Sequence, residues 1–228
     1  RKALSDFANE AGVLQKLLSE GKPGDGHEHI IGYHGVCTDG PLPYLVMDYA
    51  KHGQMNYFLR GQQSASYEKL YCLAIQLVLG LRYLHRQGYV HLDLKCANIL
   101  VDSDEHVRLS DFGLSRSESG DDRMRRGQCG TRGYMSPEMV SGEAYDPFLS
   151  DIYSLGRVFE ELLTHNGRLK SQGGSLYPNA PAGLLAMRAQ CLAENPAERP
   201  TLDALLEQLA QLKSTVPTAA ELGEILPR

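Results

Sequence analysis

The chain has 228 residues, of which 42% are hydrophobic and 22% are charged. A chain of this size can bury a complete core, as one large domain or as two small lobes, and its composition is that of an ordinary globular protein. Its formal net charge is -5, so it lacks the basic surplus that binding to nucleic acid or to an anionic membrane requires. We therefore expect neither of these as a partner.

The five cysteines are spread along the chain and form no CxxC pair. An odd, widely spaced set argues against a disulfide framework or a zinc site and fits a reducing compartment. The most apolar stretch, residues 70–84, is too short and too interrupted by polar residues to span a bilayer. No export signal is visible. The sequence therefore predicts a cytoplasmic, intracellular protein with no membrane segment in this chain.

The first part of the chain shows one helix pattern and two strand patterns. Residues 5–20 repeat apolar side chains at helical spacing, and Ser5 or Asp6 can cap the start of that helix. Residues 30–37 and 42–49 are strand-like and are joined by the turn signal "TDGP". We expect a helix followed by a hairpin.

The rest of the chain has a mainly helical pattern. Residues 114–136 contain few apolar side chains and predict an extended loop. Thr201 can cap the last of the predicted helices. Apolar residues recur at helical spacing over 66–86, 150–163, 182–193 and 201–212.

A second hairpin is predicted where the runs "NILV" and "VRLS" flank "DSDEH". If residues 102–107 form the turn, Asn98 lies opposite Asp111, at a separation of about 5 Å. An amide oxygen and a carboxylate are hard ligands that one magnesium ion can share. The hairpin therefore predicts a metal site at its open end.

Asp93 and Lys95 precede this hairpin on the same side of the chain. The carboxylate can accept a proton from an attacking hydroxyl, and the lysine can neutralise a transferring phosphoryl group. Each residue taken singly has an ordinary structural explanation, because Asp and Asn often form turns and caps and Lys is often a solvated surface charge. These residue types occurring together in this order indicate a phosphoryl-transfer site more specifically than any one of them does alone.

The motifs "HLDLKCAN", "DFG" thirteen residues after the asparagine, and "GTRGYMSPE" follow one another in the chain. They resemble the catalytic loop, the metal-binding motif and the end of the activation segment of protein kinases. The resemblance runs from about residue 3 to residue 212. It implies an α+β, protein-kinase-like two-lobe fold with a truncated small lobe and a mainly helical large lobe. The implied divisions are a small-lobe remnant of one helix and two strands, a hinge, a large lobe and a tail, at residues 1–47, 48–52, 53–213 and 214–228.

The resemblance also implies roles for the residues around the second hairpin. Asp93 would be the catalytic base, Lys95 would contact the transferred phosphate, and Asn98 and Asp111 would hold Mg2+. The implied substrates are ATP and a protein hydroxyl.

The nucleotide pocket is implied by "YLVMDYA" and by Leu100. Met47 matches the residue at the back of the pocket, while the backbone carbonyl of Asp48 and the N–H of Ala50 match the adenine contacts. Leu100 would lie under the adenine ring. From the residues alone, Met47 and Leu100 are better explained as core side chains.

Three further residues are implied to be structural supports. Asp151 would accept hydrogen bonds from backbone N–H groups around His91 and Leu92, although an acid near a helix N-terminus has a simpler explanation in the helix dipole. Glu138 and Arg199 would form an ion pair between the activation segment and the late helices.

The sequence departs from the kinase pattern in its first residues. No glycine-rich phosphate loop and no strand lysine occur in the chain, and Glu10 falls on the apolar face of its helix without the lysine that usually pairs with it. An inward-facing carboxylate is costly without a partner. We therefore expect this chain to be a piece of a longer kinase, with the partner upstream.

Two other departures affect regulation and docking. Leu92 stands where many kinases have an arginine that binds an activation-loop phosphate, and Gly127, at the position that is often phosphorylated, has no hydroxyl. We expect activity that needs no phosphate there. Only 26 residues separate Thr164 from Cys191, so the helix that commonly docks substrates in this region is expected to be missing.

The sequence thus favours ATP- and magnesium-dependent phosphoryl transfer to protein serine or threonine hydroxyls. Lys95 and the "GT" at Thr131 resemble serine/threonine kinases, and "GVCTDG", "LVMDYAKHGQM" and "GTRGYMSPEM" resemble the tyrosine-kinase-like group. The alternative is a catalytically inactive pseudokinase or scaffold module, which only the upstream sequence can distinguish. A small-molecule kinase of the same fold is argued against by "GTRGYMSPE".

Overall fold

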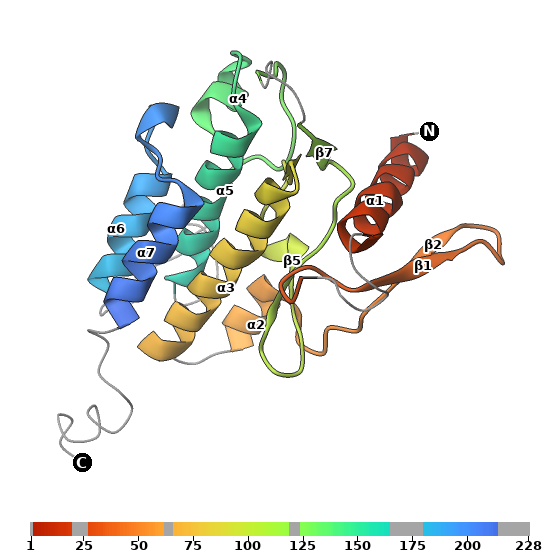
Figure 1. Ribbon diagram of the computed structural model, residues 1–228, viewed down its shortest axis with the longest axis horizontal. Helices are drawn as coiled ribbons and strands as arrows, with labels where there is room; N and C mark the ends of the chain where they lie inside the picture. Colours follow the sequence, from red (N-terminus) through yellow and green to blue (C-terminus); the bar gives the residue numbers. More distant parts are fainter. Residues whose placement is uncertain (1, 20–26, 62–65, 119–123, 165–179, 214–228) are drawn as a thin grey trace.

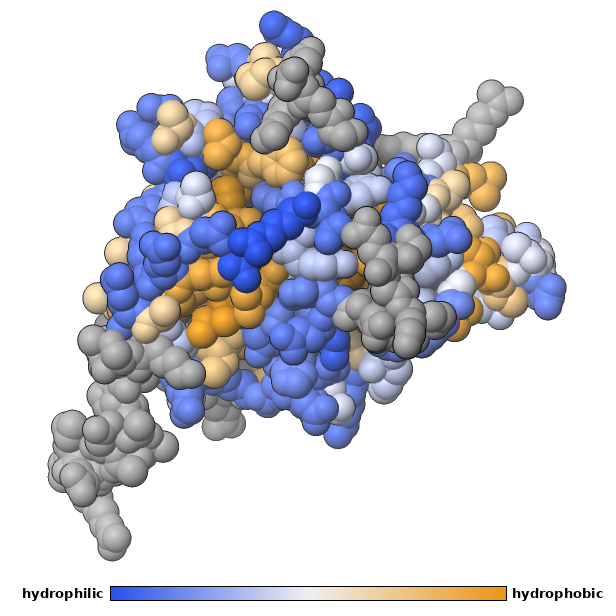
Figure 2. All heavy atoms as spheres, viewed as in Figure 1, coloured by the Kyte–Doolittle hydropathy of each residue, from blue (hydrophilic) through white to orange (hydrophobic). Residues whose placement is uncertain are grey.

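The structure is a computed structural model that describes residues 2–19, 27–61, 66–118, 124–164 and 180–213. Figure 1 shows a small region, with helix α1 (Lys2–Ser19) beside a hairpin of strands β1 (Tyr33–Cys37) and β2 (Tyr44–Met47), next to a larger helical region. The hairpin projects away from the helices and leaves apolar side chains at the surface, seen at the right of Figure 2. The fold is α+β, as predicted.

The larger region is built around two long helices, α3 (Tyr67–Arg86) and α5 (Pro147–Leu162). Helix α3 packs against α7 (Leu202–Lys213), and α5 packs against α6 (Ala182–Cys191). Shorter helices α2 (Met55–Gly61) and α4 (Pro137–Ser141) flank them, with 3-10 turns η1 (Cys96–Asn98) and η3 (Pro196–Glu198) between elements.

Helix α3 forms the centre of the core because its apolar residues fall on one face. Ser66 begins the helix, since its Oγ accepts a hydrogen bond from the N–H of Lys69 at 3.2 Å. Each fully buried leucine on this face stabilises the fold by about 1.5–3 kcal/mol. The buried residues are Leu70, Tyr71, Leu73, Ala74, Leu77, Val78, Gly80, Leu81 and Leu84.

Short antiparallel strands lie on this helical body. A three-stranded sheet has the order β3 (Gly53–Gln54), β5 (Ile99–Val101), β6 (Val107–Leu109). A second, two-stranded sheet joins β4 (Tyr89–Val90) to β7 (Arg116–Ser117). These sheets place the segment between β4 and β5 in the middle of the larger region.

The small region is attached to the larger one by backbone hydrogen bonds. The N–H of Leu109 donates to the carbonyl of His29 at 2.9 Å, and the N–H of Ile31 donates to the carbonyl of Leu109 at 2.9 Å. The hydroxyl of Tyr83 on α3 donates to the carbonyl of Leu17 on α1 at 2.9 Å. The small region is therefore attached both through residues 29–31 and through helix α1.

The predicted register of the second hairpin is wrong by one residue. Ile99 pairs with Leu109, and Val101 pairs with Val107. The N–H of Ser110 donates to the carbonyl of Asn98 at 3.0 Å. Asn98 therefore lies opposite Ser110 and not opposite Asp111.

The register differs because the turn has five residues, 102–106, where six were predicted. The Asp102 carboxylate accepts hydrogen bonds from the N–H groups of Asp104, at 3.0 Å, and His106, at 2.9 Å. Glu105 takes a left-handed conformation with φ 62. The N–H of Asp102 donates to the carbonyl of His106 at 3.0 Å, which closes the five-residue turn.

Several other sequence predictions can be compared with the structure. The helix at 66–86 and the cap at Thr201 are confirmed, since the hydroxyl of Thr201 accepts from the N–H of Ala204 at 3.1 Å. The first helix begins at Lys2, so Ser5 and Asp6 are not its caps. Among the described residues of 114–136 only β7 is a regular strand, which agrees with the predicted loop.

Helix α5 begins earlier than predicted, at Pro147. Asp146 caps it by accepting from the N–H of Phe148 at 2.8 Å, and proline suits the first helical turn because the missing N–H is not needed there. Helix α2 was not predicted.

No helix in the described ranges is long and apolar enough to cross a membrane. The predicted tail at 214–228, and most of the segment after Thr164, lie outside the described residues.

Candidate active site

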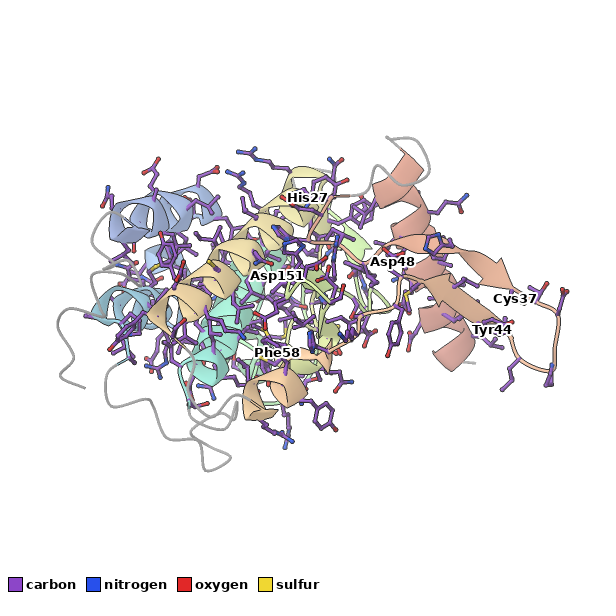
Figure 3. All side chains as sticks on the ribbon, turned by 90° about the horizontal axis from the view of Figure 1, so that it is seen from below. His27, Cys37, Tyr44, Asp48, Phe58 and Asp151 are labelled. Carbon is purple, nitrogen blue, oxygen red and sulfur yellow. The ribbon has the colours of Figure 1, made fainter. Side chains whose placement is uncertain are left out.

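Asp151 on α5 holds the backbone of the segment that carries Asp93. Its Oδ2 accepts from the N–H of His91 at 2.7 Å, and its Oδ1 accepts from the N–H of Leu92 at 2.9 Å. Figure 3 shows Asp151 inside the helical region, and its side chain is 1% exposed. Leu92 has a strained left-handed backbone with φ 64, and such strain persists only where the surroundings fix it. The role implied for Asp151 as a support agrees with these contacts.

Three of the predicted site residues meet around Asp93. Lys95 Nζ donates to Asp93 Oδ2 at 2.7 Å, and Asn98 Nδ2 donates to the same oxygen at 3.1 Å and to the Asp93 carbonyl at 3.0 Å. The Asp93 carboxylate is 11% exposed. It is therefore fixed in orientation while one side remains open to solvent.

Thr131 closes the ring from the segment before α4. Its hydroxyl donates to Asp93 Oδ1 at 2.6 Å and accepts from Lys95 Nζ at 2.7 Å. This approach requires Gly130, which has φ 94 and whose Cβ, if present, would lie 2.4 Å from the carbonyl oxygen of Leu92. The "GT" dipeptide therefore provides both the contact and the space for it.

The side chain of Asp111 is available to a ligand. It is exposed, it has a left-handed φ of 62, and it has no hydrogen-bond or ion-pair partner in the described part of the chain. Asn98 lies one residue away across the hairpin, and its amide nitrogen is used by Asp93, which leaves its Oδ1 for a ligand. Unpaired carboxylate and amide oxygens are the donors that a hard divalent cation prefers. These residues fit such an ion although the predicted register was wrong.

Glu10 on α1 adds a second acid near Asp111. Burial raises the pKa of Glu10, and the negative charge of Asp111 raises it further. The N–H of Phe112 donates to Glu10 Oε1 at 3.3 Å. No lysine or arginine of the described ranges pairs with Glu10, so the expected upstream partner stays a prediction.

Asn9 is a site residue that the sequence did not indicate. Its Nδ2 donates to the carbonyls of Phe112, Gly113 and Ser115 at 3.1, 3.0 and 2.8 Å. A single amide on α1 thereby fixes the backbone that follows Asp111. His85 is a second such residue, since its Nε2 lies 3.0 Å from Asp151 Oδ2. Both contacts join residues far apart in the chain, so no local pattern predicts them.

The predicted nucleotide residues lie where the hairpin joins the helical region. Figure 3 shows Asp48 at this junction. Met47 is 37% exposed and Leu100 is partly buried, so Met47 is not a core residue. The backbone carbonyl of Asp48 and the N–H of Ala50 make no hydrogen bond to another described residue, which leaves both free for a ligand. Their role in binding adenine stays a prediction.

A family model described as "Protein kinase domain" matches residues 2–210 of the chain. The chain belongs to the protein kinase family. It is 28% identical over 231 residues to the RasGEF domain-containing serine/threonine-protein kinase X of Dictyostelium discoideum, covering 92% of this chain and 23% of that protein.

Two other relatives support the same assignment. The chain is 29% identical over 189 residues to the mitogen-activated protein kinase kinase kinase dlk-1 of Caenorhabditis elegans, covering 77% of this chain and 20% of that protein. It is 29% identical over 226 residues to the serine/threonine/tyrosine-protein kinase HT1 of Arabidopsis thaliana, covering 92% of this chain and 55% of that protein. The chain therefore spans a quarter or less of the Dictyostelium and nematode relatives.

In this kinase Leu92 is part of an apolar cluster. Val90, Leu92, Met139 and Tyr145 are buried together, and Cys129 packs against them. The cluster joins the segment that carries Asp93 to the residues around α4 through apolar contacts.

An ion pair closes the loop on the other side of this cluster. Arg125 Nε donates to both oxygens of Glu118, at 3.0 and 3.1 Å, and the Glu118 side chain is 1% exposed. The backbones of Arg125 and Tyr145 also exchange two hydrogen bonds, at 2.8 and 2.9 Å. Arg125 is therefore bonded to both Glu118 and Tyr145 by contacts that involve no phosphate.

A negative charge at residue 127 should consequently have no effect on activity. Gly127 has φ 96 and open space around its Cα, so any side chain there adds backbone strain of about 1–3 kcal/mol but no clash. We expect Gly127→Glu and the matched Gly127→Gln to have kcat/KM values that agree within about twofold. A large rise in the rate of the Glu variant over the Gln variant would contradict this.

Proposed function

We propose that this chain is the catalytic part of an ATP-dependent serine/threonine protein kinase that acts inside the cell. The observation that carries the proposal is the ring formed by Asp93, Lys95 and Thr131, with Asn98 bonded to the same carboxylate. Phosphoryl transfer depends mainly on positioning and on neutralising charge. Thr131 and Asn98 position the Asp93 carboxylate, and Lys95 supplies the positive charge.

The acceptor is a serine or threonine hydroxyl of a protein, and it docks beside Asp93. Its oxygen forms the bond to the γ-phosphorus while the bond from that phosphorus to the β-bridging oxygen breaks and ADP leaves. The hydroxyl proton passes to the Asp93 carboxylate, which Thr131 and Asn98 keep in one orientation. Lys95 Nζ, 2.7 Å from that carboxylate, lies where it can neutralise the transferring phosphoryl group.

The nucleotide would lie between the small region and the larger one. In this proposal the carbonyl of Asp48 and the N–H of Ala50 bind the adenine, with Met47 behind it and Leu100 beneath it. Asn98 and Asp111 would hold Mg2+, which supplies charge neutralisation on the phosphates when bound. Residues 1–47 would then be the small-lobe part, 48–52 the hinge and 53–213 the large lobe.

The sequence signals also favour the tyrosine-kinase-like group. This subgroup assignment is supported by the motif resemblance and is compatible with relatives named dlk-1 and HT1. The full protein's substrates depend on the parts of the polypeptide that the relatives have beyond this match.

Transfer of the terminal phosphate is the direct test of the proposal. The protein containing this chain should move labelled γ-phosphate from ATP with Mg2+ to serine and threonine, but not to tyrosine, of an added protein mixture. Hydrolysis of the products to free phosphoamino acids identifies the acceptors. Nucleotide binding without any transfer would instead show a pseudokinase or scaffold.

A further inference from the structure

Two histidines, His27 and His29, lie where the small region joins the helical region. His27 stacks on the Tyr83 ring of α3, with ring centroids 4.5 Å apart, and its ring centroid lies 5.5 Å from that of His29. Figure 3 shows His27 beside α3. Histidine is the side chain whose charge normally changes between about pH 5 and pH 8. These two residues, called the histidine pair below, therefore place two such groups in one contact.

The ring of His29 is buried with one good hydrogen bond. The residue is 4% exposed, and its Nδ1 donates to the carbonyl of Val107 on β6 at 3.2 Å. On the side of α3 the fit is close, because a Cβ on Gly80 would lie 3.0 Å from the His29 Cβ. The other ring nitrogen, Nε2, lies 3.7 Å from Glu28 Oε1, which is beyond hydrogen-bond distance. The site therefore fits a neutral imidazole that carries its proton on Nδ1.

The charged groups around the histidine pair act against a second proton on either ring. Arg108 of β6 acts on one ring, and Arg82 of α3, which pairs with Asp203 of α7, acts on the other. Burial is the main cause that lowers the pKa of both rings below 6.5, and the two arginines lower it further. Glu28 and the carbonyl bonded to His29 act in the opposite direction. The Glu28 side chain is 71% exposed, so water screens its charge.

The backbone of His29 carries part of the attachment of the small region. Its carbonyl accepts from the N–H of Leu109 at 2.9 Å, and the N–H of Ile31 donates to the carbonyl of Leu109 at 2.9 Å. Water can surround the His29 ring only if the ring leaves the space between α3 and β6, and that movement strains these two bonds. A charged ring therefore favours a state in which residues 27–31 are detached from β6.

We propose that the histidine pair is an acid-sensitive attachment, which holds the small region on the helical region while both rings are neutral and releases it when they take up protons. The detached state binds more protons below pH 6.5, so the attachment is fully present above this pH and weakens as the pH falls through it. Release would separate the two regions between which the nucleotide is proposed to lie. The attachment itself does not depend on phosphoryl transfer.

Hydrogen exchange measured by mass spectrometry tests this attachment, with exchange times scaled to the intrinsic rate at each pH. In the protein that contains this chain, peptides covering 27–33 and 107–112 should exchange at least about threefold faster at pH 5.5 than at pH 7.5 after this scaling. His29→Asn should remove most of the increase, because the asparagine amide can donate to the Val107 carbonyl but takes up no proton. All other titrating groups, Glu10 included, are the same in both proteins.

Two further variants complete the comparison. His27→Phe can keep the stacking on Tyr83 without a charge, so it should reduce the increase in exchange without abolishing it. His106→Asn is the matched control, because His106 is a histidine of the β5–β6 turn that is 48% exposed, and its exchange should rise as in the unaltered protein. Thermal unfolding at pH 7.5 shows which variants are folded. If His29→Asn is not, His27→Phe decides, and an unreduced increase there would overturn the inference.

Nucleotide binding separates this inference from the proposed function. The Kd for ATP, measured by calorimetry, should rise between pH 7.5 and pH 5.5 by a larger factor in the unaltered protein than in His29→Asn. If ATP binds at neither pH, the proposed function fails, whereas hydrogen exchange still tests the attachment. Scaled exchange that does not depend on pH in the unaltered protein would refute the inference. An equal increase in a folded His29→Asn variant would refute it as well.

Discussion

Asp93→Asn should lower kcat by a factor of about 100 to 10,000 without unfolding the protein, because it removes only the proton acceptor. The asparagine can keep the contacts of the ring. Its Oδ1 can accept from Lys95 and Asn98 as Asp93 Oδ2 does, at 2.7 and 3.1 Å. Its Nδ2 then faces Thr131, whose hydroxyl can turn from donor to acceptor.

Steady-state phosphorylation of a protein substrate measures this effect, and thermal unfolding shows that the fold is intact. Asp104→Asn is the control, since Asp104 is an exposed aspartate in the β5–β6 turn, away from the ring. The control should keep full activity. If Asp93→Asn kept kcat within about fivefold of the unaltered protein, Asp93 would not be the base.

The residues of this ring could be predicted from sequence because they are carried by short, ordered motifs. Asp93, Lys95 and Asn98 lie within six positions of one another, and the "GT" at Thr131 is part of a recognisable run. Local spacing places Asp93, Lys95 and Asn98 together, whereas Thr131, 36 positions after Lys95, was indicated only by the family resemblance. That Asn98 shares a metal site with Asp111 stays a prediction, and the register from which it was argued is wrong.

The register failed because the prediction assumed a turn length and did not apply the apolar alternation. Directly opposed residues share a face of the sheet, so the buried Ile99 and Val101 have to pair with the buried Leu109 and Val107, which requires a five-residue turn. Asp102, which caps the turn, and Glu105, which takes the left-handed conformation, stabilise that turn. A left-handed glutamate has no sequence signal comparable to that of glycine.

The long-range polar contacts of Asn9 and His85 were another part that the sequence did not reveal. Asn9 reaches carbonyl groups more than one hundred positions away, and His85 meets Asp151 from another helix. One signal was available for α5. Ser150, Ser154 and Arg157 interrupt an apolar helix at helical spacing, and such a stripe indicates a polar partner on that face.

The buried ion pair of Glu138 and Arg199 should be among the strongest single contributions to stability. Arg199 donates to Glu138 Oε1 at 2.6 Å and to Oε2 at 2.8 Å, and its side chain is 0% exposed. It also donates to the carbonyls of Leu149 and Ala193, each at 3.0 Å. One side chain therefore joins α4 to the start of α5 and to the turn between α6 and α7.

Arg199→Met should lower the free energy of unfolding by about 3–5 kcal/mol, because it leaves the Glu138 carboxylate buried without its partner. Equilibrium unfolding in urea measures this loss. Arg82→Met is the matched control, since Arg82 pairs with the exposed Asp203 at 3.0 Å. An exposed pair contributes about 0–1 kcal/mol. Similar losses of unfolding free energy in the two variants would show that the buried Glu138–Arg199 pair stabilises the protein no more than an exposed pair does.

The pH dependence of stability gives an independent measure of the same pair. Burial acts to raise the pKa of Glu138, but the hydrogen bonds from Arg199, from Ser136 and from the Glu138 backbone, together with the charge of Arg199, outweigh it and hold the pKa below its usual value of 4.5. The unfolded chain then binds more protons than the folded one between these two pKa values, so stability is lost as the pH falls through that window. Above pH 4.5 the contribution is fully present.

Glu138→Gln isolates this contribution, because the other carboxylates titrate equally in both proteins. At neutral pH we expect the variant to be less stable by about 3–5 kcal/mol, since Arg199 keeps its buried charge and loses its partner. The difference between the two proteins should shrink as the pH drops below 4.5, because the unaltered protein also loses its carboxylate charge. A difference that stays constant from pH 7 to pH 3 would mean that shape and neutral hydrogen bonds, rather than the ion pair, stabilise this junction.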